Sequence, residues 1–141
     1  VSPHQRVFEE IEHTADRALR IYGSNLEELL LNAARGMNFL MAPVLEYIPG
    51  AEHHKKIVAL EAADTESLLV DWLSELAFWA EIEMIVFNQF LLEDVSPTHL
   101  RAKVDGARVA RLEKHIKAVT YHNLEIVQTK NGLTATVVFD V

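Results

Sequence analysis

Cysteine is absent from this chain of 141 residues, which excludes disulfides, a thiol nucleophile and every zinc site built on cysteine. No apolar run approaches the length of a membrane span. The first residues, Val1-Ser2-Pro3-His4, lack the pattern of a signal peptide. Together these absences predict a cytoplasmic protein that makes no contact with a membrane.

The motifs of the common enzyme classes are also missing. The sequence contains no glycine-rich phosphate loop, no nucleophile elbow and no zinc-protease helix. Ser96 and Thr120 each have a histidine nearby, at His99 and His122, but no acid or oxyanion hole can be placed beside either pair. We therefore expect a protein that is not an enzyme.

The chain is strongly acidic, but its charge is unevenly spread. The net charge is −8, and the composition is ordinary for a single folded domain covering residues 1–141. Residues 101–117 carry six basic and two acidic side chains, a net +4, so the remainder carries −12. Such a body suits a basic protein partner, and we expect no strong direct binding of nucleic acid. The plainer interpretation is a solvated surface with one basic loop.

Hydrophobic periodicity predicts two helices among several strands. The first helix follows a capping box at Ser24 and Glu27 and ends before Pro43. The second follows a cap at Asp64 or Thr65. Strands are expected at residues 7–12, 19–22, 56–61, 86–94, 98–105, 118–121, 124–129 and 133–139. The pattern predicts an α+β fold with two amphipathic helices packed on a mostly antiparallel sheet of seven or eight strands.

Three local signals depart from regular helix and strand. The last two strands flank Lys130-Asn131-Gly132, and an Asn-Gly pair in that position predicts a type I′ hairpin turn. Phe78 falls off the apolar stripe of the second helix, so Phe78 and Met84 are candidates for an exposed contact patch. Residues 44–54 are expected to form a long loop, and residues 106–113 to be irregular.

Two acidic residues mark the best candidate site. Asp16 follows the turn after the first strand, and Asp140 ends the last strand before Val141. If these strand ends meet in one sheet, two side-chain carboxylates and a terminal carboxylate converge, and a hard cation would relieve their repulsion. Oxygen ligands favour Ca²⁺, Mg²⁺ or Mn²⁺ over zinc or copper. Spacing alone leaves open that Asp16 is a turn residue and Asp140 a solvated strand end.

Four segments resemble the archease family, over nearly the whole length of the chain. They are residues 13–16 (His-Thr-Ala-Asp), 69–76, 117–124 and 138–141. The third is the most specific, because its Lys-Ala-Val-Thr-Tyr-His run has no simple packing explanation. Many relatives have Val/Ile-Gly after the aspartate, where this chain has Arg17-Ala18. The Arg17 guanidinium could pair with Asp16 and compete with a metal.

The resemblance implies a small accessory protein of a GTP-dependent RNA-splicing ligase. Such a ligase joins 3′-phosphate or 2′,3′-cyclic phosphate ends to 5′-hydroxyl ends in tRNA splicing or RNA repair. The accessory protein would promote guanylylation of the ligase and its multiple turnover. The resemblance also implies a divalent metal, with Ca²⁺ first and Mg²⁺ or Mn²⁺ as alternatives, held by Asp16, Asp140 and Val141.

The same resemblance makes His13, Lys117 and His122 candidates for contacts with the partner. Two other functions remain open. One is a chaperone-like partner of a tRNA cytosine methyltransferase, which would use an exposed apolar patch. The other is a metal-dependent hydrolase using Asp16 and Asp140, which would need a concave pocket with a base beside an open metal position.

Overall fold

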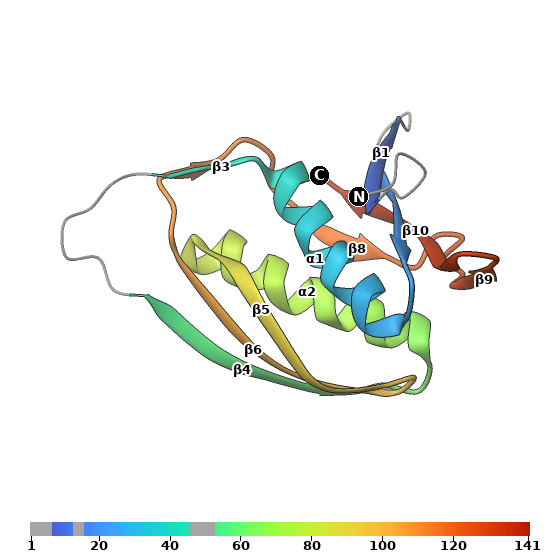
Figure 1. The fold of residues 1–141 in the computed structure, drawn as a ribbon. Coiled ribbons are helices and arrows are strands. Elements are labelled where there is room, and N and C mark those ends of the chain that lie inside the picture. The colour runs from blue at the N-terminus through green and yellow to red at the C-terminus, as the bar shows by residue number, and fades with distance from the viewer. Residues whose placement is uncertain (1–6, 13–15, 46–52) are drawn as a thin grey trace.

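Two helices lie between two antiparallel sheets in the computed structural model, which describes residues 7–12, 16–45 and 53–141 (Figure 1). The helices are α1 (Leu26–Met41) and α2 (Thr65–Glu83). The described strands are β1 (Phe8–Glu12), β2 (Arg17–Gly23), β3 (Pro43–Val44), β4 (His54–Glu61), β5 (Ile85–Ser96), β6 (His99–Arg108), β7 (Arg111–Leu112), β8 (Ala118–Thr120), β9 (Val127–Thr129) and β10 (Gly132–Asp140). The predicted α+β class is confirmed.

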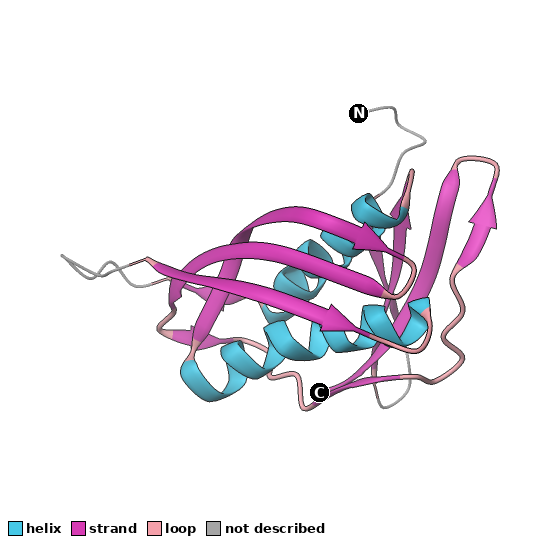
Figure 2. Cartoon of the chain, turned by 90° about the horizontal axis from the view of Figure 1, so that it is seen from below, coloured by secondary structure: helices cyan, strands magenta, loops and turns pink. Residues whose placement is uncertain are grey.

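The described strands form a first sheet of order β1-β2-β10-β8, with β9 also paired to β10, a second sheet of order β4-β6-β5, and a small two-stranded sheet of β3 and β7. The second sheet lies in front of both helices when the molecule is seen from below (Figure 2). The prediction of one sheet was wrong. Each helix has apolar residues on two sides, and each side packs against a different sheet. Helix α1 contacts β2 and β5, whereas α2 contacts β8 and β5.

The first helix begins one residue later than predicted. The cap is Asn25, whose side chain accepts a hydrogen bond from the Glu28 N–H at 2.8 Å. The Glu28 carboxylate in turn accepts from the Ser24 backbone N–H at 3.2 Å and from its hydroxyl at 2.9 Å. The capping box is therefore shifted by one position, because β2 continues through Gly23 and leaves Ser24 in the connection.

The second helix begins as predicted at the cap Asp64, which accepts from the Ser67 N–H at 2.7 Å. That backbone hydrogen bond, with a second one from the Ser67 side chain, lowers the pKa of the Asp64 carboxyl below its usual 3.8. The Trp72 indole N–H donates to the Leu30 carbonyl at 2.9 Å and joins the two helices inside the core. Neither described helix is long and apolar enough to span a membrane.

Strand β2 and strand β10 form the centre of the first sheet. Leu19 lies opposite Val137 and Ile21 opposite Ala135, and all four side chains are buried against the helices. The register continues to Arg17 opposite Phe139. Because successive side chains of a strand point to opposite faces, this register sorts every other residue of both strands onto the outer face.

The turn before β10 is not the predicted type I′ turn. That type needs positive φ at both central residues, but Asn131 is not among the residues with positive φ, and the left-handed position is Gly132 with a φ of 131°. A Cβ on Gly132 would lie 2.2 Å from the Gly23 carbonyl oxygen. Gly132 therefore serves a close approach of β10 to the end of β2.

Residues 106–113 are more regular than predicted. Strand β6 continues to Arg108, and β7 pairs with β3. Strand β3 lies at the start of the expected long loop and β7 within residues 106–113, and together they raise the described strand number above the seven or eight predicted. Strand β9 is shorter than the predicted strand 124–129 and begins at Val127. The Ile126 N–H donates to the Glu66 carboxylate at 3.0 Å and not to a neighbouring strand.

Candidate functional site

Asp16 and Asp140 meet at one end of the first sheet. Arg17 lies opposite Phe139 in the antiparallel register, so the same register continued by one residue places Asp16 opposite Asp140. Directly opposed residues in such a pair have Cβ atoms about 4.5–5.5 Å apart. Phe139 is fully buried toward the helices, so the alternation directs the neighbouring Asp140 side chain to the outer face, where it is exposed.

A third strand holds Asp140 from the other side. Ala118 of β8 is the register partner of Asp140, and the Lys117 N–H donates to the Asp140 carbonyl at 2.8 Å. The Val141 side chain packs against the hydrophobic core. These contacts fix the backbone on which Asp140 and a Val141 terminal carboxylate are presented.

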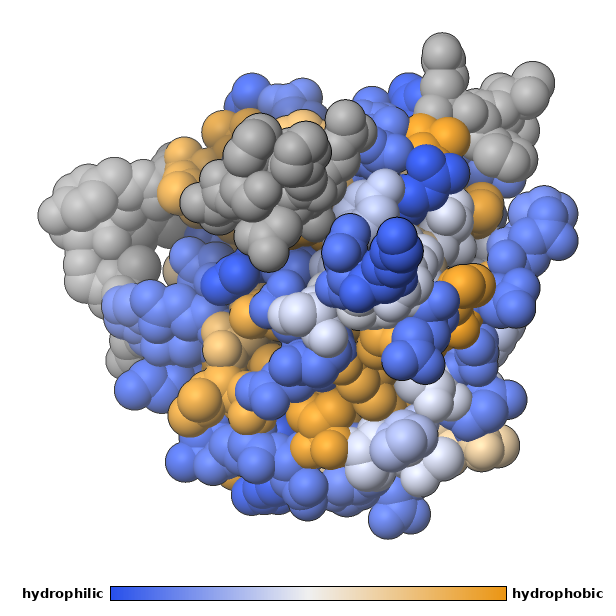
Figure 3. Space-filling view, turned by 45° about the vertical axis from the view of Figure 1, so that its right-hand side comes forward, coloured by the Kyte–Doolittle hydropathy of each residue, from blue (hydrophilic) through white to orange (hydrophobic). Residues whose placement is uncertain are grey.

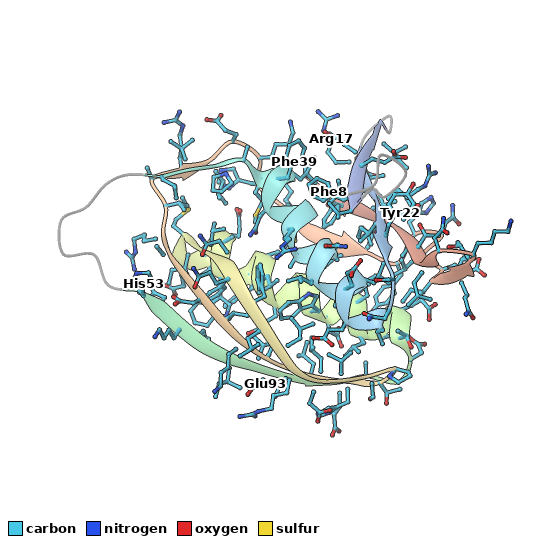
Figure 4. The ribbon with its side chains drawn as sticks, viewed as in Figure 1. Phe8, Arg17, Tyr22, Phe39, His53 and Glu93 are labelled. Atoms are coloured by element: carbon cyan, nitrogen blue, oxygen red, sulfur yellow. The ribbon has the colours of Figure 1, made fainter. Side chains whose placement is uncertain are left out.

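The described basic residues leave the carboxylates at this end without an ion pair. Among residues 7–12, 16–45 and 53–141, no ion pair joins the side chain of Asp16 or Asp140 to a basic residue. The Arg17 side chain, which the sequence offered as a competitor for Asp16, instead lies 3.7 Å from the Glu10 carboxylate, measured from Nε to Oε1. Figure 4 shows Arg17 near Phe8 and Phe39, beside the C-terminal end of α1.

The number of ligands at this end is small. In the described part of the chain, no three His, Asp or Glu side chains gather closely enough to hold a metal. Among the described residues, a metal centre built on Asp16 and Asp140 would have only these two side-chain carboxylates. Since Ca²⁺ takes six to eight oxygen ligands, such a centre leaves several positions for water or for groups of a partner.

The three candidates for partner contacts have different outcomes. His13 lies outside the described residues. Lys117 is exposed and precedes β8 at the carboxylate end, whereas His122 follows the other end of β8 in a turn. The His122 backbone N–H donates to Thr120 Oγ1 at 3.3 Å, and its ring nitrogen lies 3.2 Å from Asn123 Nδ2. The structure thus places Lys117, but not His122, beside Asp140.

A groove that spacing did not predict lies on the other side of β8, against α2. Its volume is about 340 Å³. The lining residues are Ser74, Ala77, Phe78, Glu81, Ile82, Ile116, Lys117, Ala118 and Val119. Phe78 is 51% exposed, as its place off the apolar stripe indicated, and Ile82 is 62% exposed. Met84, the other residue of the predicted patch, is only half-buried and caps the helix, so Ile82 takes its place.

A larger hollow, of about 880 Å³, lies on the second sheet. Its lining comes from three adjacent rows across β4, β6 and β5, and consists of Lys55, Lys56, Ile57, Gln89, Phe90, Leu91, Lys103, Val104 and Asp105. Neither this hollow nor the groove beside α2 is lined by Asp16 or Asp140. Asp140 is exposed at the end of β10, and Asp16 is half-buried before β2.

Comparison with known proteins places the sequence among archeases. The model of the Archease protein family (MTH1598/TM1083) matches residues 8–141. Among curated proteins, "Protein archease" of Methanosarcina mazei is 37% identical over 142 residues, with 95% of each chain covered. "Protein archease" of Methanopyrus kandleri is 33% identical, with 95% of this chain and 99% of that protein covered.

Solved structures agree with this assignment. The crystal structure of an archease, described as a possible chaperone, from Thermotoga maritima has a TM-score of 0.70 and 27% identity, covering 98% of this chain and all of that one. The solution structure of Methanobacterium thermoautotrophicum protein 1598 has a TM-score of 0.64 and 31% identity, covering 96% of this chain and 99% of that one.

Proposed function

The chain belongs to the archease protein family, and on that premise we propose that it is an accessory protein of a GTP-dependent RNA-splicing ligase. In this role it carries a divalent metal at the end of its first sheet and promotes guanylylation and multiple turnover of the ligase. The partner, the metal and the site are parts of the proposal. The opposition of Asp16 and Asp140 across β2 and β10 supports it most directly.

The physical argument for the metal is electrostatic. Two carboxylates opposed across adjacent strands repel each other, and a terminal carboxylate at Val141 adds to that repulsion. A hard cation between them removes the repulsion and is favoured by oxygen ligands. Ca²⁺ fits first, because it tolerates an irregular set of ligands, whereas Mg²⁺ demands a nearly ideal octahedron.

The position of the two aspartates outside both described hollows favours an accessory role over hydrolysis. A metal-dependent hydrolase needs its metal in a concave, water-excluding pocket with a base beside it. Asp16 and Asp140 lie outside both hollows described above. Coordination positions of the metal that the protein does not fill are available to groups of a partner. An accessory protein that helps to place GTP or its metals in a ligase active site would need such positions.

Calorimetry with Ca²⁺, Mg²⁺ and Mn²⁺ tests the metal, and a guanylylation assay with the ligase tests the role. Asp16→Ala and Asp140→Ala should each abolish metal binding and ligase activation while the protein remains folded. Glu125→Ala, which removes an exposed acid outside the site, should behave as wild type. A C-terminal tag should weaken binding partly, because it converts the Val141 carboxylate into a peptide carbonyl.

Two results would contradict the proposal. Metal binding that is equal in the wild type and both aspartate variants would exclude the site. A wild-type protein that binds metal but leaves ligase guanylylation and turnover unchanged would exclude the accessory role. Steady hydrolysis of GTP by the purified chain alone would favour an enzyme instead.

A further inference from the structure

The groove beside α2 is the most apolar indentation near the candidate metal centre. Phe78 and Ile82 are separated by four residues, one helical turn, and both point outward from α2. Ile116, which is buried, and the 117–119 backbone close the other side. Large apolar side chains that cluster in an exposed groove typically mark a contact with another molecule.

The groove is continuous with the carboxylate end. Lys117 and Ala118 line the groove, and the same two residues are joined to Asp140, by the hydrogen bond from the Lys117 N–H and by the register of β8 and β10. Only β8 separates the two features, and neighbouring strands are about 4.8 Å apart. A protein that contacts a metal at Asp16 and Asp140 therefore passes within reach of Phe78.

The charge around the groove selects the kind of partner side chain. Asp71 and Glu81 lie on the same side of α2 as Phe78, and Glu81 is the acid among the groove lining. Glu81 pairs with His115 at 2.8 Å on the rim. Lys117 is the one basic residue among the groove lining. An occupant with an apolar body and a nearby basic group matches an apolar floor with an acidic rim.

We propose that this groove, formed by α2 and residues 116–119, is a second contact with the same RNA ligase and receives an apolar side chain flanked by a lysine or arginine. The inference rests on the proposed function for the identity of the partner. In this proposal, two adjacent surfaces of the protein have different roles. The carboxylate end carries the metal, and the groove supplies binding energy that does not depend on it.

The test compares two pairs of equally exposed apolar residues. In the first variant, Phe78→Gln and Ile82→Gln are combined, because glutamine keeps the helix and removes the apolar contact. In the control, Ile57→Gln and Leu91→Gln are combined on the second sheet. The four residues have similar exposures, 51% and 62% in the groove and 53% and 59% in the control.

The groove variant should bind the ligase at least about tenfold more weakly than wild type, as expected when a central apolar contact is lost. Its affinity for Ca²⁺ and its thermal midpoint should remain those of the wild type. The control pair should leave ligase affinity unchanged. A conservative variant, Phe78→Leu with Ile82→Leu, should restore most of the affinity because it keeps the groove apolar.

The outcomes separate this inference from the proposed function. If wild type binds and activates the ligase but the groove variant binds it equally well, the groove is not a contact and the inference is overturned. Equal weakening by the groove and control pairs would also overturn it, since the effect would not be local. If the wild type itself neither binds nor activates the ligase, the proposed function fails first.

Discussion

The carboxylate end of the first sheet and the outer face of the second sheet both carry acidic side chains, but the neighbours of these acids differ between the two regions. On the second sheet, Glu93 lies 3.9 Å from Arg101 and 3.7 Å from Lys103, and Asp105 lies 3.3 Å from His53. At the end of the first sheet, Asp16 opposes another acid, Asp140, across the strands. The second sheet therefore places basic side chains or a histidine beside its acids, whereas the end of the first sheet places two acids side by side.

The larger hollow and the candidate metal site also lie in different parts of the molecule. The hollow of about 880 Å³ lies on the second sheet, between a row containing Ile57 and Leu91 and a row containing Lys55 and Asp105. Figure 4 shows His53 and Glu93 on this sheet, away from Arg17 and the hairpin of the first sheet. This hollow is lined by three lysines, Lys55, Lys56 and Lys103, with one acid, Asp105, so its charge does not favour a cation.

The surface around the first sheet is not uniformly polar either. On the side that carries β9 and β10, hydrophobic side chains appear in groups between hydrophilic ones (Figure 3). Single exposed apolar residues are ordinary on protein surfaces. Phe78 and Ile82 differ because they share one groove next to the carboxylates.

The largest expected effect comes from neutralising pairs of acids in each region. Asp16→Asn with Asp140→Asn should abolish the thermal stabilisation that Ca²⁺ gives the wild type. That stabilisation is about 2.7 kcal/mol at a free ion concentration of 100 Kd, or roughly 5–10 °C in melting temperature. Glu93→Gln with Asp105→Asn should retain it, because those acids are already paired. Thermal melts with and without Ca²⁺ measure this difference. If both double variants lose the Ca²⁺-dependent shift, the metal is not specific to the end of the first sheet.

A second effect, of about 2 kcal/mol, is expected from one glycine in each sheet. In Gly132→Ala the new Cβ meets the Gly23 carbonyl at 2.2 Å and the positive φ is strained, whereas in Gly106→Ala it meets the Val86 carbonyl at 2.1 Å. Asn131→Ala should be nearly neutral, because Asn131 does not need positive φ. Denaturant unfolding measures all three variants. A cost at Asn131 as large as that at Gly132 would instead support a type I′ turn.

The smallest effect concerns Asp64, a carboxylate that is stabilised by a backbone N–H and belongs to neither region. Its folded pKa lies below the usual 3.8, so it contributes stability above that value, and the contribution is lost as pH falls through the lowered pKa. Asp64→Asn keeps a capping oxygen but removes the titration. The stabilities of wild type and variant should converge below the folded pKa of Asp64 and separate above 3.8. Parallel stability curves from pH 2 to 6 would show that the cap carboxylate is not linked to folding.

Local chemistry made much of the fold predictable. The Asp64 cap, the exposed Phe78 and the alternation of Leu19 and Ile21 follow from nearby residues, because capping and side-chain periodicity act over a few positions. The α1 cap was predicted one residue early, since Ser24-x-x-Glu27 and Asn25-x-x-Glu28 satisfy the same rule and only the length of β2 distinguishes them. The Asn-Gly pair predicted the wrong turn type for a similar reason. The close approach of Gly132 to the Gly23 carbonyl oxygen, which involves a distant strand, requires glycine at this position.

The sequence by itself determined which groups are available: two acids at the ends of two strands, a basic segment in an acidic body, and an apolar residue outside a helix stripe. Tertiary structure alone decided that Asp16 and Asp140 follow directly on the paired ends of β2 and β10, that Arg17 lies beside Glu10, and that β8 lines a groove against α2. The physical reason is that pairing between distant strands depends on burying both sheets against the helices. That burial is a property of the whole core, and no local pattern of side chains contains it.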